Sequence, residues 1–129
     1  MRVSDIIRVK GDEVVSLSTN ASVQDLLDVF ADRNIGAVVL RENARVVGMV
    51  SERDLVRAAR HDLDRSAPVR GLGNPQVITC IPDDDVEDLA RVMTDKRVRH
   101  VLVVDDEAEG EDDLVGIVSI GDVVKARLD

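Results

Sequence analysis

The sequence of 129 residues contains one cysteine, two histidines and one phenylalanine, and it has no tryptophan or tyrosine. A single cysteine excludes an intramolecular disulfide, and so few cysteines and histidines argue against a structural zinc site. Nucleic-acid bases would find almost no aromatic side chains to stack on, and the net charge of −9 repels a polyanion. We therefore expect no disulfide, no metal site and no nucleic-acid-binding surface.

Long hydrophobic runs are missing as well. No apolar run approaches the roughly 20 residues that a helix needs to span a bilayer. The amino-terminal residues lack the hydrophobic stretch of a signal peptide. The content of 44% apolar and 33% charged residues is typical of one soluble globular domain. These features predict a cytoplasmic protein without membrane association.

A seven-residue motif occurs twice in the chain. Residues 48–54 read Gly-Met-Val-Ser-Glu-Arg-Asp, and residues 116–122 read Gly-Ile-Val-Ser-Ile-Gly-Asp. Upstream positions repeat at a fixed spacing, so that Val23 and Asp25 correspond to Val86 and Asp88. A five-residue insertion in the second copy falls in the connection of residues 105–113, and insertions are typical of surface loops.

Each copy contains the same predicted elements: a strand, an amphipathic helix, two apolar strands and a second helix. They span residues 14–17, 22–33, 37–40, 46–50 and 51–60 in the first copy, and residues 77–81, 85–97, 101–104, 114–118 and 119–128 in the second. About sixty residues bury too little surface to be stable alone. We therefore predict an α+β fold, in which two β-α-β-β-α repeats pack with pseudo-twofold symmetry through their sheets.

The whole chain, residues 1–129, is predicted to form a single module. Repeat 1 spans residues 3–60, and a short leading turn or helix is expected over residues 2–11. Residues 61–76 contain glycine and proline and are expected to be a linker with one helical turn near residues 69–72. Repeat 2 spans residues 77–128.

Ser51 with Asp54, and Ser119 with Asp122, have Ser-x-x-Asp spacing at the start of a predicted helix. The spacing is that of a capping box, in which each side chain accepts a hydrogen bond from the other residue's amide. It also suits a nucleotide, because a helix start attracts phosphate and an ionised carboxylate can accept both hydroxyls of a ribose. The glycine before each motif lets the strand approach a neighbour or a ligand closely. Two such motifs inside one duplication favour the binding function.

Other acidic residues receive a purely structural interpretation. Ser22 and Asp25 share the spacing but follow no glycine-containing strand, and with Asp85 and Asp88 we assign them to capping. The acidic run of residues 105–113 begins like a calcium loop, yet its twelfth position is Gly116, where a bidentate glutamate is required. We expect a solvated hairpin tip there.

The sequence resembles the cystathionine-β-synthase (CBS) domain family, as a stand-alone tandem pair of CBS motifs called a Bateman module. The resemblance covers residues 3–128 and is carried by residues 77–82 (Val-Ile-Thr-Cys-Ile-Pro), 97–105 (Arg-Val-Arg-His-Val-Leu-Val-Val-Asp) and 114–119 (Leu-Val-Gly-Ile-Val-Ser). The chain departs from relatives at residues 69–72, where an Ile-Met pair is common. This difference concerns the linker.

The resemblance implies two clefts between the repeats, each able to take an adenosine-type ligand such as AMP, ADP, ATP, NAD or S-adenosylmethionine. No cofactor is required. Asp54 and Asp122 are implied to bind ribose, with Ser51 and Ser119 near phosphate. Each cleft is also implied to receive a hydroxyl from the opposite repeat. The further residues implied to contact ligand are Thr79 for the Asp54 cleft, Ser16 for the Asp122 cleft, and, against the base, Gly36, Ala37 and Val38 in one repeat and Arg99, His100 and Val101 in the other.

The two repeats differ in charge at one matching position. Arg99 and His100 stand where the first repeat has Gly36 and Ala37, which concentrates phosphate-binding side chains in the second repeat. Arg53, inside the first motif, is a third candidate for phosphate. The alternative for all three basic side chains is a solvated surface charge.

Three functions follow from these observations. The first is a regulatory sensor that binds adenosine compounds, forms a homodimer and acts on a separate protein. The second is a scaffold or dimerisation module with empty clefts. The third and weakest is an enzyme, because no nucleophile and base stand together by motif; Cys80 has no histidine nearby in sequence and is expected to pack at a strand end. We predict a protein that is not an enzyme.

Overall fold

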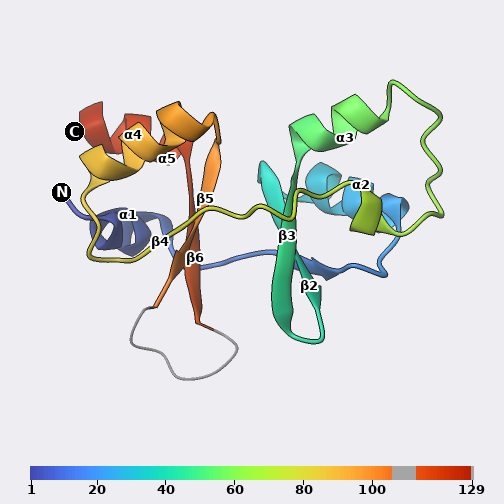
Figure 1. Cartoon of the computed structure of the whole chain (residues 1–129), viewed down its shortest axis with the longest axis horizontal. Coiled ribbons are helices and arrows are strands. Elements are labelled where there is room, and N and C mark those ends of the chain that lie inside the picture. Colours follow the sequence, from blue (N-terminus) through green and yellow to red (C-terminus); the bar gives the residue numbers. More distant parts are fainter. Residues whose placement is uncertain (106–112, 129) are drawn as a thin grey trace. The chain divides into compact units, whose positions relative to one another are not determined.

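The computed structural model describes residues 1–105 and 113–128, which fall into two units (Figure 1). The terminal unit comprises Met1–Val14 and Ile78–Asp129, and the central unit comprises Val15–Val77. Both ends of the chain therefore belong to the same unit. The predicted hairpin tip and its five-residue insertion lie mostly outside the described residues.

The elements follow the predicted β-α-β-β-α order twice, with one helix in front. The central unit contains β1 (Ser16–Ser18), α2 (Val23–Asp32), β2 (Ala37–Glu42), β3 (Arg45–Ser51), α3 (Glu52–Ala58) and the 3-10 helix η1 (Val69–Gly71). The terminal unit contains α1 (Val3–Lys10), β4 (Thr79–Cys80), α4 (Val86–Lys96), β5 (His100–Val104), β6 (Leu114–Ser119) and α5 (Ile120–Leu128). The α+β class is confirmed, and so is a helical turn inside the predicted linker.

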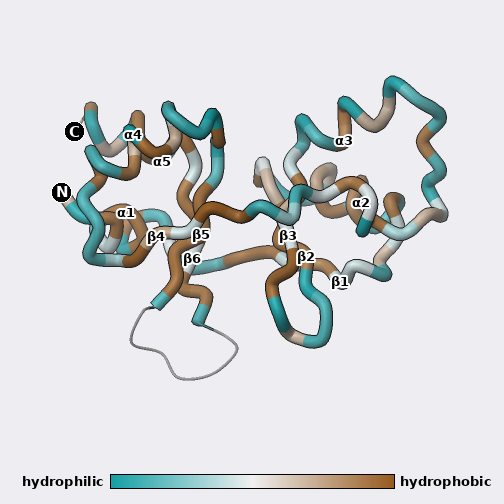
Figure 2. The backbone as a smooth tube through the Cα atoms, in the orientation of Figure 1, coloured by the Kyte–Doolittle hydropathy of each residue, from teal (hydrophilic) through white to brown (hydrophobic). Residues whose placement is uncertain are grey.

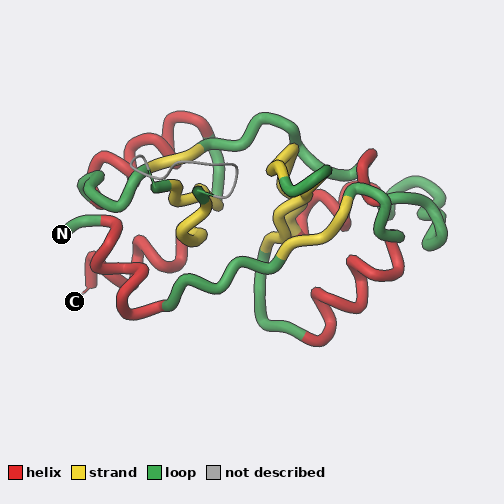
Figure 3. Tube along the Cα trace, turned by 90° about the horizontal axis from the view of Figure 1, so that it is seen from below, coloured by secondary structure: helices red, strands yellow, loops and turns green. Residues whose placement is uncertain are grey.

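Each unit has a three-stranded mixed sheet. β1 pairs with β2 in parallel and β2 with β3 antiparallel, and β4, β5 and β6 repeat this arrangement. Figure 3 shows the helices of each unit gathered on one side of its strands. Because the last two strands are antiparallel, the carboxyl end of β3 lies beside the start of β2, and the carboxyl end of β6 lies beside the start of β5.

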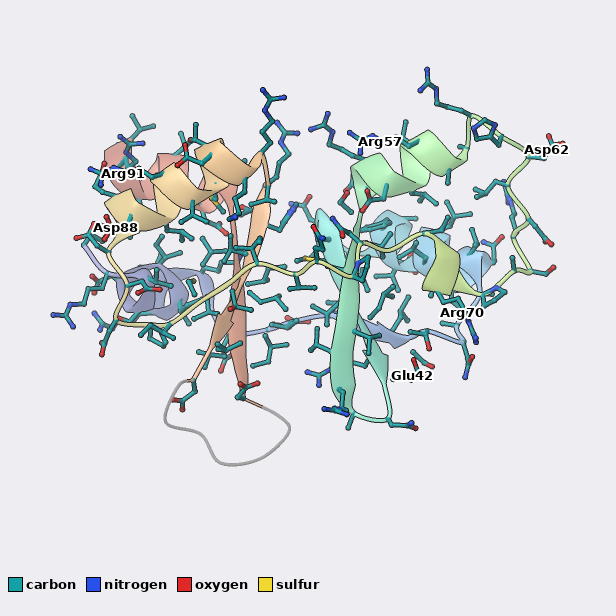
Figure 4. The ribbon with its side chains drawn as sticks, viewed as in Figure 1. Glu42, Arg57, Asp62, Arg70, Asp88 and Arg91 are labelled. Atoms are coloured by element: carbon teal, nitrogen blue, oxygen red, sulfur yellow. The ribbon has the colours of Figure 1, made fainter. Side chains whose placement is uncertain are left out.

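The helices start where local capping chemistry places them. Ser22 and Asp25 form a reciprocal capping box at α2, and Asp85 caps α4 by accepting from the Glu87 amide at 2.8 Å. Asp88 differs from the predicted capping role. Its carboxylate pairs with Arg91 on the next turn, at 3.4 Å and on the exposed face of α4 shown in Figure 4.

Each unit has its own hydrophobic core. Figure 2 shows hydrophobic and hydrophilic residues alternating along α1 and α4, as expected for helices with one buried face. The core of the central unit includes Val23, Leu26, Val38, Leu40, Val50, Leu55 and Val69. The core of the terminal unit includes Val3, Ile6, Val86, Leu89, Met93, Val101, Val118 and Val123.

The segments that lead into the two repeats are exchanged. α1 precedes repeat 1 in the chain but packs into the core of the terminal unit, where Val3 is fully buried. η1 precedes repeat 2 but packs into the central unit, where Val69 is fully buried. Arg70, labelled in Figure 4, adds a hydrogen bond from η1 to the Asn20 side chain. Each repeat is therefore completed by the segment that precedes the other.

The motif glycines make room for these leading segments. A Cβ at Gly116 would lie 2.7 Å from the Ile7 Cδ1 atom of α1. A Cβ at Gly48 would lie 3.0 Å from the carbonyl oxygen of Asn74, which follows η1. The close neighbour expected from the sequence is, in both units, a leading segment of the same chain.

The largest difference from the predicted elements concerns the strand of residues 77–81, because only Thr79–Cys80 pairs as β4. Pro82 has no amide to extend the ladder, and the Val77 amide bonds the Pro75 carbonyl oxygen at 3.1 Å in a turn. The expectation that the two sheets pack with pseudo-twofold symmetry stays a prediction.

Candidate functional site

The Ser51 and Asp54 pair lies where β3 ends and α3 begins. The Ser51 amide donates to Asp54 Oδ2 at 2.8 Å, and the Asp54 amide donates to Ser51 Oγ at 3.2 Å. The capping interpretation is therefore correct in geometry. It uses one acceptor position of a carboxylate that offers about four, so ribose hydroxyls can still be accepted.

The Ser119 and Asp122 pair repeats this arrangement where β6 passes into α5. The Ser119 amide donates to Asp122 Oδ2 at 2.8 Å, and the Asp122 amide donates to Ser119 Oγ at 3.2 Å. The Ser119 hydroxyl, like that of Ser51, accepts in this bond and keeps its own proton for another acceptor. Both motifs thus hold a carboxylate and a hydroxyl donor in matched geometry at a helix start.

The start of the neighbouring strand lies next to each pair. Ala37 is opposite Ser51, and the Glu52 amide donates to the Gly36 carbonyl oxygen at 3.1 Å. In the terminal unit His100 is opposite Ser119, and the Ile120 amide donates to the Arg99 carbonyl oxygen at 2.8 Å. The sheet register therefore brings the predicted strand residues to the predicted motif within each unit.

The charges around the two pairs differ in one way that the sequence does not indicate. Lys10, the last residue of α1, places its Nζ atom 2.5 Å from Asp122 Oδ2, and the two side chains are only 30% and 24% exposed. Burial acts to raise the pKa of Asp122, but the hydrogen bonds and charge of Lys10 and the Ser119 amide hold this pKa below its ordinary value of 3.8. Asp122 is therefore ionised and already paired with a cation.

A comparison with known proteins identifies the family. The sequence profile of the CBS domain matches this chain twice, at residues 3–61 and at residues 69–129. The chain belongs to the CBS-domain family. Its similarity to the CBS domain-containing protein YhcV of Bacillus subtilis (strain 168) amounts to 27% identity over 112 residues, which are 86% of this chain and 76% of that protein.

Solved CBS-domain structures are similar over nearly the whole chain. The CBS-domain containing protein ATU1752 from Agrobacterium tumefaciens has a TM-score of 0.87 and 34% identity, with 98% of this chain and 99% of that chain covered. The CBS domain protein PAE2072 from Pyrobaculum aerophilum, complexed with AMP, has a TM-score of 0.80 and 33% identity, with 95% and 89% covered. Both the family resemblance and the fold expected from it are confirmed.

The remaining predicted contacts of the CBS repeats divide by exposure. Ser16, Thr79 and Arg53 are exposed, and so is Arg99. The side chains of Val38 and Val101 have no exposed surface, because they belong to the two cores. We therefore leave both valines out of the contacts proposed below. The assignment of Thr79 to the Asp54 site and of Ser16 to the Asp122 site stays a prediction.

The single cysteine is a poor candidate for a catalytic nucleophile. Burial, with a smaller effect of the Asp84 charge, raises the pKa of the Cys80 thiol to about 12, so the reactive thiolate is scarce at neutral pH. No group of three or more potential metal ligands is found in residues 1–105 and 113–128. Within the same residues, no helix combines the length and apolar character needed to cross a membrane. That the protein is not an enzyme stays a prediction.

Proposed function

We propose that this CBS-domain protein is a regulatory module that binds adenosine-containing ligands through the carboxylates of Asp54 and Asp122. The observation that carries this proposal is the matched geometry of the two Ser-x-x-Asp pairs, each beside the start of a strand. The AMP complex of the similar PAE2072 structure supports a ligand of this class. Candidate ligands are AMP, ADP, ATP and NAD.

At each site a ribose is expected to donate its two hydroxyls to the free lone pairs of one carboxylate, that of Asp54 or that of Asp122. Ser51 and Ser119 have a hydroxyl proton to donate to phosphate. Arg99 is exposed next to the Ser119 pair and takes part in no ion pair among the described residues, so it is the leading candidate for a phosphate contact. His100, on the adjacent strand position, is the second candidate, and Arg53 of α3 is the third.

Binding is tested by thermal unfolding with a panel of AMP, ADP, ATP, NAD and S-adenosylmethionine. A ligand at about one hundred times its dissociation constant adds about 2.7 kcal/mol to the free energy of unfolding. We expect stabilisation by at least one of these compounds. We also expect that replacing both Asp54 and Asp122 by alanine removes it.

Asp25→Ala is the matched control for these substitutions. Asp25 forms a capping box with Ser22 in which both hydrogen bonds measure 3.0 Å, so its replacement costs the same kind of capping energy, about 1 kcal/mol. It leaves both proposed ribose anchors intact. Ligand stabilisation that disappears equally in Asp25→Ala would point to general loss of stability, and stabilisation that survives in the double aspartate variant would refute the ribose assignment.

The alternative function is a scaffold that uses the same fold with no ligand. A uniform lack of stabilisation across the panel would favour it. The homodimer remains part of either function, and α3 and α5 offer Val56 and Val124, which are 69% and 51% exposed. Sedimentation equilibrium of the protein and of a Val56→Lys, Val124→Lys variant tests whether these positions lie in the interface; unchanged self-association in the variant would place it elsewhere.

A further inference from the structure

The two proposed ribose anchors are not equivalent, because only Asp122 is paired with a lysine. Lys10 Nζ and the Ser119 amide both donate to the same atom, Asp122 Oδ2. At Asp54 the corresponding oxygen accepts from the Ser51 amide, and no lysine or arginine pairs with this carboxylate among residues 1–105 and 113–128. The two sites thus differ at the carboxylate itself, because the proposed ribose acceptor carries an ion pair at Asp122 and, within the described part of the chain, none at Asp54.

The position of Lys10 follows from the packing of α1. Val3 and Ile6 are buried in the core of the terminal unit. Ile7 packs over Gly116, which lies in β6 three residues before Ser119. The helix end is thereby fixed near the Ser119 motif, while the four-carbon stem of Lys10 leaves its ammonium group free to turn. The ammonium is tethered at the carboxylate and can still be displaced from it.

The ion pair competes with the hydrogen bonds that a ribose would make. Both partners are mostly shielded from water, so the attraction is screened less than that of an exposed pair. A ribose that donates two hydroxyls to Asp122 needs lone pairs on both carboxylate oxygens, and Oδ2 already accepts twice. Ribose binding that uses both oxygens of Asp122 therefore requires the Lys10 contact to be given up, whereas Oδ1 alone remains open while the ion pair is formed.

We propose that Lys10 is an internal competitor for Asp122, which makes the Asp122 site the weaker ribose anchor, so that adenosine, which has no phosphate, fills the Asp54 site first. The inference rests on the proposed function and specifies its order of binding. Occupation of the Asp122 site releases the Lys10 side chain at the end of α1, directly before the connection of residues 11–14 that joins the terminal unit to the central unit.

The test isolates the second site with an Asp54→Ala background and uses adenosine, which has no phosphate, as the probe in calorimetric titrations. Adding Lys10→Met keeps the aliphatic stem and removes the charge. Loss of a shielded ion pair should tighten adenosine binding about threefold to tenfold. Lys125→Met in the same background is the matched control, because it removes one exposed positive charge from α5 of the same unit. The control should leave adenosine affinity unchanged.

Several results would overturn the inference. If Lys10→Met leaves adenosine affinity unchanged or weakens it, the inference is wrong. The proposed function still stands in that case, provided that the Asp54→Ala, Asp122→Ala protein does not bind adenosine. Weaker AMP binding with unchanged adenosine binding would make Lys10 a phosphate contact instead. Absence of binding by the unsubstituted protein refutes the proposed function and this inference together.

A measurement without ligand checks the contact itself. The carboxyl carbon of Asp122 can be titrated by NMR in the unsubstituted protein and in Lys10→Met. Removal of the ammonium should move the pKa of Asp122 upward, because Lys10 lowers it by both a hydrogen bond and its charge. A pKa of Asp122 that does not move would show that the pair does not form in solution, and would overturn the inference independently of any ligand.

Discussion

Val3 and Val69 occupy corresponding positions in the two units and make corresponding backbone hydrogen bonds. The Val3 amide donates to the Asp84 carbonyl oxygen at 2.9 Å, and the Val69 amide donates to the Ala21 carbonyl oxygen at 2.8 Å. Both side chains are fully buried. The leading segments are thus integral parts of the two cores.

Replacing Val3 by alanine should lower the free energy of unfolding by about 2 kcal/mol, because buried methyl groups are lost and a cavity remains. The matched control is Val9→Ala on the same helix. Val9 is 83% exposed, and its replacement should change stability by no more than about 0.5 kcal/mol. Chemical denaturation measures both. Equal effects of the two substitutions would contradict the packing of α1 described above.

Gly48→Ala should destabilise the protein by about 1 to 2 kcal/mol. The new methyl group would lie 3.0 Å from the Asn74 carbonyl oxygen, and Asn74 is held against Met49 by two backbone hydrogen bonds of 2.9 and 3.1 Å. Gly71→Ala is the control, since a methyl group there meets nothing within 4 Å. Alanine at this position should stabilise by about 0.4 to 1 kcal/mol through the unfolded state. Thermal unfolding measures both variants. Stability changes of the same sign in Gly48→Ala and Gly71→Ala would contradict the close contact between Gly48 and Asn74.

Ala44→Gly should stabilise the β2–β3 hairpin. Asn43 and Ala44 have φ values of 52° and 69°, the pattern of a type I′ turn, in which glycine is preferred at the second position. Relief of the left-handed strain exceeds the added entropy of glycine, so we expect a gain of about 0.5 to 1 kcal/mol. Ala59→Gly, at a φ of −69°, should bring no such gain. A stability loss in Ala44→Gly, measured by urea denaturation, would contradict the turn conformation.

Acid should weaken the terminal unit through Asp122. Its pKa in the folded protein lies below 3.8, so its stabilising contribution is present above that pH and is lost as the pH falls through the folded-state pKa. We expect the pH dependence of the free energy of unfolding below about pH 5 to be smaller in Lys10→Met. Urea denaturation at several acidic pH values measures this. An identical dependence in both proteins would mean that the ion pair adds nothing to folding.

The Cys80 thiol should react slowly with alkylating reagents at neutral pH. It is 8% exposed, and burial raises its pKa to about 12. Labelling followed by mass spectrometry should be slow in the native protein and complete in denaturant. Rapid native labelling would show an accessible thiolate and would reopen the possibility of a reactive cysteine.

Much of the fold was predictable because its signals are local. The capping boxes at Ser22 and Ser51, the amphipathic spacing of α2 and α4 and the repeated motif each depend on residues within a few positions of one another. The strand at Thr79 is shorter than its apolar sequence predicts, because the Val77 amide donates to the Pro75 carbonyl oxygen and the Ile81 amide donates to Asp84 Oδ2.

The site was only partly predictable for the opposite reason. The register that brings Ala37 to Ser51 follows from the antiparallel β2–β3 pairing. Lys10 and Asp122, in contrast, are 112 positions apart, and their contact depends on which unit α1 joins. The spacing of Val3 and Ile6 shows only that the helix has one apolar face, and nothing in it selects a sheet. The burial of Val38 and Val101 likewise depends on packing that a strand pattern does not reveal.

The placement of both chain ends in the terminal unit, visible in Figure 1, has a mechanical consequence. The central unit is inserted in the chain between Val14 and Ile78, so tension applied at the two ends acts first on the terminal unit. α1 must be pulled from β6 and α5 before any load reaches Val15. In a protein tethered at both ends, the Lys10 contact with Asp122 would thus be lost first. The central unit, which holds Ser51 and Asp54, would stay folded because it bears no load until then.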